Sequence, residues 1–186
     1  GDGWATPQRD DGSFGGEQRQ FDQVVIATHS DQALAMLADP GEAEQAVLGA
    51  LPYQENDVVL HTDVRLLPEN RDTWSSWNYR LGVDEQRAVV TYNMNILQGL
   101  EAPETFCVTL NNTSAINPHK ILGRFSYAHP VFSLAGVRAQ GRWGDINGQR
   151  RTWYCGAYWH NGFHEDGVAS ALRVAQALAG SEQAAA

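Results

Sequence analysis

A chain of 186 residues that is 42% hydrophobic and 19% charged has the composition of a globular protein, with enough apolar material for one sizeable core or for a domain and part of another. Its formal net charge of −9 argues against nucleic acid as a partner, because phosphate binding requires a basic face. No apolar run is long enough to span a bilayer, and residues 1–21 are too polar for a signal peptide, so we expect neither a transmembrane segment nor a secretory leader.

The two cysteines, Cys107 and Cys155, each lie in an apolar run that resembles a strand. This placement is typical of buried thiols in a reducing compartment, so we expect a cytoplasmic protein. The sequence contains no Cys-x-x-Cys, His-Glu-x-x-His or Cys/His cluster, which argues against a structural zinc site.

The first predicted strand covers residues 21–28, whose mostly apolar side chains are typical of a strand buried on both faces in a parallel sheet. Ser30 or Asp31 is expected to cap a helix over residues 32–38. Pro40 and Gly41 break this helix, and a second helix is predicted over residues 42–50.

After residue 51 the pattern changes to a succession of strands. The predicted strands cover residues 57–63, 74–80, 87–95, 105–110 and 121–127. The polar turn at residues 82–86 predicts that the second and third form an antiparallel hairpin. A series of strands with no long helix between them indicates an antiparallel sheet over residues 51–127, in a layer separate from the first strand. Shorter helical patterns are present at residues 95–100 and 133–143.

The C-terminal region predicts a strand over residues 152–155, a glycine-rich turn over 156–162 and a helix over 164–178. Val168, Leu172, Ala175 and Leu178 recur every three or four residues, so we expect this stripe to pack on a sheet. A strand, a glycine-rich turn and a helix together present free backbone N–H groups to an anionic or electron-rich ligand.

Two stretches of this region resemble the flavin-contacting C-terminal segment of the FAD-dependent amine oxidase family. They are Cys-Gly-Ala-Tyr, which starts at Cys155, and Gly-Phe-His-Glu-Asp-Gly, which starts at Gly162. The likeness is to the family's bacterial branch of NAD/FAD-binding proteins, and further similar phrases extend it over about residues 21–178. The resemblance implies that small residues after the strand approach the FAD pyrophosphate and ribityl chain, and that the helix amides lie near the N1–C2=O edge of the flavin. The first role falls on Gly156 and Ala157, and the second on Gly162, Phe163, His164, Glu165, Asp166 and Gly167.

The fold that this resemblance implies is α+β: an antiparallel-sheet substrate domain joined to the C-terminal strand–helix piece of an FAD/NAD(P)-binding, Rossmann-like domain. Residues 1–50 would be a return strand and helices towards the cofactor domain, residues 51–145 the substrate domain, and residues 146–186 the C-terminal piece. The implied activity is FAD-dependent oxidation of an amine or of an apolar, lipid-like small molecule. No catalytic side chain is assigned, because the flavin itself performs the redox step.

The family's N-terminal Gly-x-Gly-x-x-Gly unit has no counterpart here, since residues 11–16 have the wrong spacing and no apolar strand precedes them. We therefore expect the C-terminal portion of such an enzyme: a fragment, a truncated reading frame or one half of a split protein. Alone it should be inactive, bind FAD weakly, self-associate through exposed apolar edges and need the missing dinucleotide-binding half. The alternative is a non-catalytic α+β module that binds a partner chain or an apolar ligand.

Overall fold

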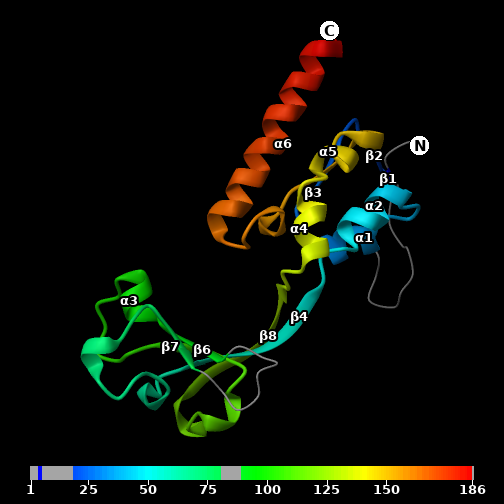
Figure 1. Ribbon diagram of the computed structural model, residues 1–186. Helices are drawn as coiled ribbons and strands as arrows, with labels where there is room; N and C mark the ends of the chain where they lie inside the picture. The colour runs from blue at the N-terminus through cyan, green and yellow to red at the C-terminus, as the bar shows by residue number, and fades with distance from the viewer. Residues whose placement is uncertain (1–3, 6–18, 81–88, 186) are drawn as a thin grey trace. The chain divides into compact units, whose positions relative to one another are not determined.

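The computed structural model describes residues 4–5, 19–80 and 89–185 (Figure 1). The chain divides into two compact units, which we call the first unit (Gly1–Tyr53 with Pro130–Ala186) and the second unit (Gln54–His129). Residues 130–145, which the sequence analysis grouped with the sheet, belong to the first unit.

The second unit is built on an antiparallel sheet. Its five described strands have the order β5-β6-β7-β4-β8. They are β4 (Tyr53–His61), β5 (Trp77–Arg80), β6 (Val89–Asn93), β7 (Cys107–Leu110) and β8 (Ile121–Pro130). The predicted antiparallel sheet is confirmed, as is the hairpin of β5 and β6, in which Trp77 lies opposite Tyr92. The predicted turn at residues 82–86 lies outside the described residues.

The two faces of this sheet differ in polarity and burial. Residues directly opposite each other on antiparallel strands share a face, and one face is buried although it is largely polar: Val59, His61, Thr91, Asn93, Cys107 and Thr109. Leu66 and Ile116, from the connecting segments, pack against Val59 on this face. The opposite face is apolar and, apart from Val58, not fully buried; it carries Val58, Leu60, Trp77, Tyr79, Val90, Tyr92, Val108 and Leu110.

A chain of hydrogen bonds satisfies the buried polar face. The backbone N–H of Asp63 donates to Nδ1 of His61 at 3.0 Å, and Nε2 of His61 lies 2.7 Å from Oγ1 of Thr109. Since Nδ1 accepts, Nε2 carries the proton of a neutral imidazole. Oγ1 of Thr109 in turn lies 2.9 Å from Oγ1 of Thr91. Burial lowers the pKa of His61, against the opposing effect of Asp63, so this histidine is a neutral structural residue.

Short helical segments connect the strands of the second unit. They are η1 (Val64–Leu66), η2 (Arg71–Thr73), α3 (Met94–Gln98), η3 (Thr113–Ala115) and η4 (Pro118–Lys120). The predicted helical turn at residues 95–100 is confirmed as α3, which ends at Gly99 in the left-handed conformation (φ 63°) that glycine adopts without steric cost.

The first unit contains a parallel pair of strands, β3 (Val24–Ile26) and β9 (Thr152–Tyr154). These strands do not belong to the sheet of the second unit, which confirms the predicted separation into two layers. The prediction that residues 21–28 form a strand buried on both faces is wrong: β3 is only three residues long, and Val25 is 47% exposed. Within the described residues the parallel sheet has just these two strands, and the Val25 side chain is only partly covered.

Helices complete the first unit. They are α1 (Ser30–Met36), α2 (Glu42–Leu48), α4 (Leu134–Gln140), α5 (Trp143–Ile146) and α6 (His164–Ala185), with 3-10 turns η5 (Gln149–Arg151) and η6 (Ala157–Trp159). A further short pair, β1 (Trp4–Ala5) and β2 (Arg19–Gln20), is antiparallel. The N-cap of α1 is His29 rather than Ser30 or Asp31, because Ser30 is fully buried and its hydroxyl donates to the carbonyl of Leu51 instead.

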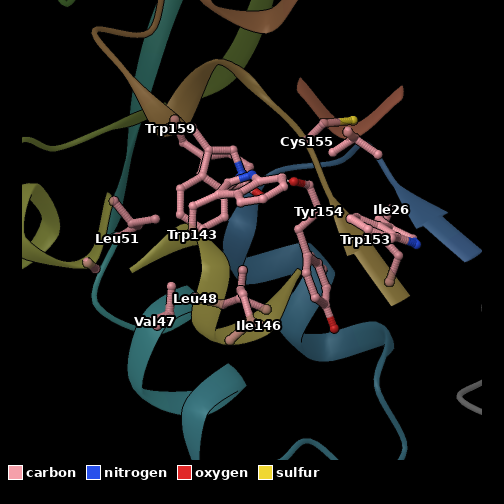
Figure 2. Close-up of a cluster of buried hydrophobic side chains, with 14 residues drawn as sticks. Ile26, Val47, Leu48, Leu51, Trp143, Ile146, Trp153, Tyr154, Cys155 and Trp159 are labelled. Atoms are coloured by element: carbon pink, nitrogen blue, oxygen red, sulfur yellow. The ribbon is translucent and has the colours of Figure 1, made fainter. Parts of the chain in front are cut away.

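The core of the first unit surrounds Tyr154 of β9 (Figure 2). Leu48, Ile146 and Val47, all fully buried, come from α2 and α5. The Tyr154 hydroxyl donates a 2.6 Å hydrogen bond to the carboxylate of Glu44, which also accepts from the N–H of Gly41 at 2.7 Å. These bonds satisfy the polar groups that β9 and α2 bring into the core.

Candidate functional site

The predicted cofactor-binding residues begin where strand β9 ends. The N–H of Cys155 donates to the carbonyl of Ile26 at 3.1 Å, which extends the parallel pairing by one residue. Gly156 follows, and then the 3-10 turn η6. Because β3 and β9 are parallel, their carboxyl ends lie at the same edge, and the turn from Gly156 to Gly162 starts there. In open α/β sheets this is the edge at which ligands bind.

Gly156 is tied to helix α6 by a buried serine. Its N–H donates to Oγ of Ser170 at 2.8 Å, and that hydroxyl donates to the carbonyl of Gly167 at 3.0 Å. Ser170 is only 1% exposed. The amide of Gly156 is therefore satisfied inside the protein and is not free for a ligand.

Packing also explains why residue 156 is a glycine. A Cβ atom at this position would lie 2.5 Å from Cε1 of Tyr158, a distance that real Cβ contacts do not show. A side chain at residue 156 would thus displace the Tyr158 ring whether or not a cofactor is present.

Ala157 lies next to the start of α6. Its carbonyl accepts from the N–H of Gly162 at 3.2 Å, and a Cβ atom at Gly167 would lie 3.9 Å from its nitrogen. Gly162 adopts φ 87°, which favours glycine. The fold therefore brings Ala157, Gly162 and Gly167 together, and within the described residues the N–H of Ala157 has no acceptor.

The first turn of α6 contains both free amides and a carboxylate. Oδ2 of Asp166 accepts from the N–H groups of Asn161 (3.1 Å) and Phe163 (2.9 Å), and so caps the helix. The first backbone bond into the helix runs from the N–H of Gly167 to the carbonyl of Phe163 at 3.2 Å. The N–H groups of His164, Glu165 and Asp166 precede it, at positions where a helix supplies no backbone acceptor.

Apolar side chains surround this turn. Phe163 is 71% exposed, and Phe132 lies beside Gly162, where a Cβ atom would be 3.6 Å from Cζ of the phenylalanine. Together with the free amides, these rings form a surface that can contact an aromatic ligand with hydrogen-bond acceptors at its edge. The imidazole of His164 is exposed, so its backbone N–H is the more useful group.

The predicted packing stripe of the C-terminal helix is only partly present: Leu178 packs against the core of the first unit, but Ala175 is exposed. Val168 and Leu172 are more than half exposed, and the buried residues of α6 are instead Ser170 and Val174. The helix is also longer than predicted and ends at Ala185 (Figure 1). The apolar side chains at positions 168 and 172 are therefore left mostly uncovered by the described part of the chain.

Sequence reasoning missed two side chains at this site. The only sequence signal for Ser170 is its position four residues before Val174, on the same face of the helix, and the burial of Val174 is known only from the structure. Tyr158 is 3% exposed, and its hydroxyl has no hydrogen-bond partner among the described residues. Burial raises its pKa, so the phenol stays protonated and remains a potential donor.

Residues 4–5, 19–80 and 89–185 contain no group of three or more His, Cys, Asp or Glu side chains that could hold a metal ion. Both cysteines are buried free thiols, as predicted. In this same part of the chain, no helix combines the length and hydrophobicity that crossing a bilayer requires.

The residues present fit the backbone part of a flavin site, namely unpaired amides at the carboxyl edge of a parallel pair. The Asp166 carboxylate offsets the positive potential at the N-terminus of α6. The site therefore offers uncharged backbone N–H groups as hydrogen-bond donors. Comparison with protein-family models finds none that matches this chain, and comparison with curated proteins finds no match either.

Proposed function

We propose that this chain is the C-terminal part of an FAD-dependent oxidoreductase that resembles the amine oxidases. The proposal rests on one observation: unpaired backbone amides of Ala157 and of the first turn of α6 lie together at the carboxyl edge of β3 and β9. FAD, when bound, would supply the redox chemistry. Of the candidate residues at 156, 157 and 162–167, those with unpaired amides, Ala157 and residues 164–166, would bind and orient it, while Gly156, Gly162 and Gly167 would shape the turn that holds them.

The amides of His164, Glu165 and Asp166 would face the electron-rich N1–C2=O edge of the flavin. A helix N-terminus stabilises a negative charge by about 0.3–1 kcal/mol when exposed and up to about 2 kcal/mol when partly buried. The carboxylate of Asp166 reduces this effect, because it already accepts two backbone N–H groups at the same helix end. We therefore assign the main contribution to hydrogen bonds rather than to the net helix field.

The apolar face of the sheet in the second unit supports an amine or an apolar, lipid-like substrate. Trp77 and Tyr79 on this face are both more than half exposed, and Tyr92 lies opposite Trp77. Large exposed apolar patches usually mark surfaces that bind a ligand or a partner.

The proposal requires a dinucleotide-binding half as partner. Parallel sheets are normally covered on both faces and have more than two strands. Here the described sheet has two strands, Val25 is half exposed, and the apolar residues Val168 and Leu172 of α6 are more than half exposed. A further parallel α/β layer would cover these groups.

The test compares two substitutions of the same residue. His164→Pro removes one backbone N–H at the first position of α6, where proline is well tolerated, whereas His164→Ala removes only the imidazole. In the chain combined with its dinucleotide-binding half, we expect His164→Pro to weaken FAD binding about two- to tenfold, as for one lost hydrogen bond. His164→Ala should bind like the unmodified protein.

The readout is FAD content and flavin absorbance after purification, together with FAD titration. Equal affinity of the proline and alanine variants would refute the role of the amide, and absence of FAD from the combined protein would refute the proposal itself. Gly156→Val is not an informative test, because its side chain would clash with Tyr158 even without a ligand.

A second candidate is a non-catalytic α+β module, or half of a split protein, that needs a partner chain. The exposed apolar residues of α6 and β3 favour it, because they need a covering surface but not a cofactor. A partner that restores a soluble complex without any bound flavin would support this candidate over the oxidoreductase.

A further inference from the structure

A cleft of about 240 Å³ lies in the second unit, between the η1 region and strand β5. The side chains that matter for its chemistry are Arg65, Leu66, Leu67, Glu69, Tyr79 and Arg80. Its volume is smaller than the roughly 300 Å³ at which sites for drug-sized ligands begin. The cleft therefore suits a small molecule.

The η1 side of the cleft is rigidly held. The carboxylate of Asp63, which is fully buried, accepts bonds from Nε (2.9 Å) and Nη2 (2.6 Å) of Arg65. It also accepts the N–H of Asn117 at 2.8 Å. Since two nitrogens of the guanidinium are bound on one side, Nη1 of Arg65 keeps a fixed orientation and is free to donate to a ligand.

The same side provides an apolar wall. Leu66 and Leu67 are 8% and 5% exposed, so they are anchored in the protein while still lining the cleft. The indole N–H of Trp74 donates to the carbonyl of Pro68 at 2.8 Å and closes the loop that follows. The small part of Leu66 and Leu67 that remains exposed is apolar and can contact an aliphatic group.

The opposite side is the free edge of β5, which is the terminal strand in the described sheet. Asn93 donates its N–H to the carbonyl of Ser76 at 2.9 Å, so residues 76 and 78 point their backbone groups toward β6. By alternation, the N–H and C=O of Tyr79 point away from β6, and Tyr79 is one of the residues that line the cleft. They offer one donor and one acceptor.

The charges around the cleft balance each other. Arg65 is neutralised by Asp63, whose pKa is held well below its usual range chiefly by the side-chain hydrogen bonds from Arg65. Arg80 and Glu69 are both exposed, and neither has an ion-pair partner among the described residues. The cleft thus carries one unpaired positive group and one unpaired negative group and has no net charge.

We propose that this cleft binds a small zwitterion with an aliphatic body, of the α-amino acid class. The ligand carboxylate pairs with Arg80 and with Nη1 of Arg65, and the ammonium pairs with Glu69 and the carbonyl of Tyr79. The aliphatic side chain lies on Leu66 and Leu67. A plain anion or a plain cation would leave one of the two charges unmatched. The inference goes beyond the proposed oxidoreductase function and does not require FAD.

The experiment uses the chain as it is, with L-leucine as the probe and isothermal titration as the measurement. Two analogues isolate the charges: 4-methylpentanoate lacks the ammonium, and 3-methylbutan-1-amine lacks the carboxylate. We expect saturable binding of L-leucine below about 10 mM, and about tenfold weaker binding of each analogue, as for the loss of one charge-assisted contact.

Variants then locate the site. Arg80→Gln and Glu69→Gln change exposed residues and should each weaken L-leucine binding about tenfold. Arg124→Gln and Glu101→Gln change equally exposed residues of the same unit that do not line the cleft, and they should bind like the unmodified chain. The proposal is overturned if L-leucine shows no saturable binding, if either analogue binds as tightly as L-leucine, or if the cleft variants match the controls.

Discussion

The buried bond between Ser170 and Gly156 can be tested by Ser170→Ala. The substitution removes a hydroxyl that accepts from the Gly156 N–H at 2.8 Å and donates to the Gly167 carbonyl at 3.0 Å. The Gly167 carbonyl lies inside helix α6 and keeps its helical partner. The Gly156 N–H, by contrast, is left without an acceptor beside a buried position, since Ser170 is only 1% exposed.

The expected cost follows from this single unsatisfied group. Leaving a buried donor unpaired costs about 1–3 kcal/mol. Alanine is a better helix former than serine by about 0.5 kcal/mol, which offsets part of the loss. We therefore expect the unfolding free energy of the first unit to fall by about 0.5–2.5 kcal/mol, which lowers Tm by about 1–10 °C for a chain of this size.

Ser181→Ala is the matched control. Ser181 lies in the same helix and also donates to the carbonyl three residues before it, that of Leu178, at 2.7 Å. It is exposed and accepts no bond from another segment, so its replacement should change stability by no more than about 0.5 kcal/mol. Urea unfolding followed by the fluorescence of Trp153 and Trp159, both buried in the first unit, measures the two variants. Equal stability of the two would show that the Ser170 bond does not tie the turn to the helix.

Three further outcomes are expected. Burial lowers the pKa of His61, whose usual value is about 6.5. Below that pH the unfolded chain therefore binds more protons than the folded chain. The stability of the second unit against urea should thus fall as the pH drops from 7 to 5. His61→Gln should remove that part of the slope, and His119→Gln, at an exposed site, should retain it. Burial raises the pKa of Cys107 to about 11, so iodoacetamide at pH 8 should label this thiol only after unfolding, and rapid labelling of the native chain would contradict its burial. Leu172→Glu should reduce self-association in sedimentation experiments, whereas Gln176→Glu, which adds the same charge to another exposed position of α6, should leave it unchanged.

The local elements follow from sequence periodicity. The run of alternating residues after position 51 predicts an antiparallel sheet, and the observed order places the hairpin of β5 and β6 at its edge. The strand–turn–helix from Thr152 onward is also present, with Gly162 in a conformation that favours glycine. These features depend on the residues' own backbone preferences and on side-chain alternation, which neighbouring positions in the chain determine.

Burial within those elements could not be predicted in the same way. Val168 and Leu172 have helical spacing with Leu178, yet α6 packs through Ser170, Val174, Ala177 and Leu178 and leaves positions 168 and 172 exposed. Gly156 lies close to both this helix and Tyr158, and close approach of the backbone favours small residues there. A hydrophobic pattern identifies an apolar face, but the shape of the opposing surface decides which face is covered.

The sequence by itself determined the α+β class, the separate layers, the buried thiols and the turn that carries the candidate cofactor residues. Tertiary structure alone decided that the Gly156 amide is bound by Ser170, that His61 is buried and neutral, and that Arg65, Glu69 and Arg80 share one cleft. The physical reason is the range of the interactions involved. Periodicity and turn preference act over a few residues, whereas hydrogen-bond partners and charge environments come from segments that only folding brings together.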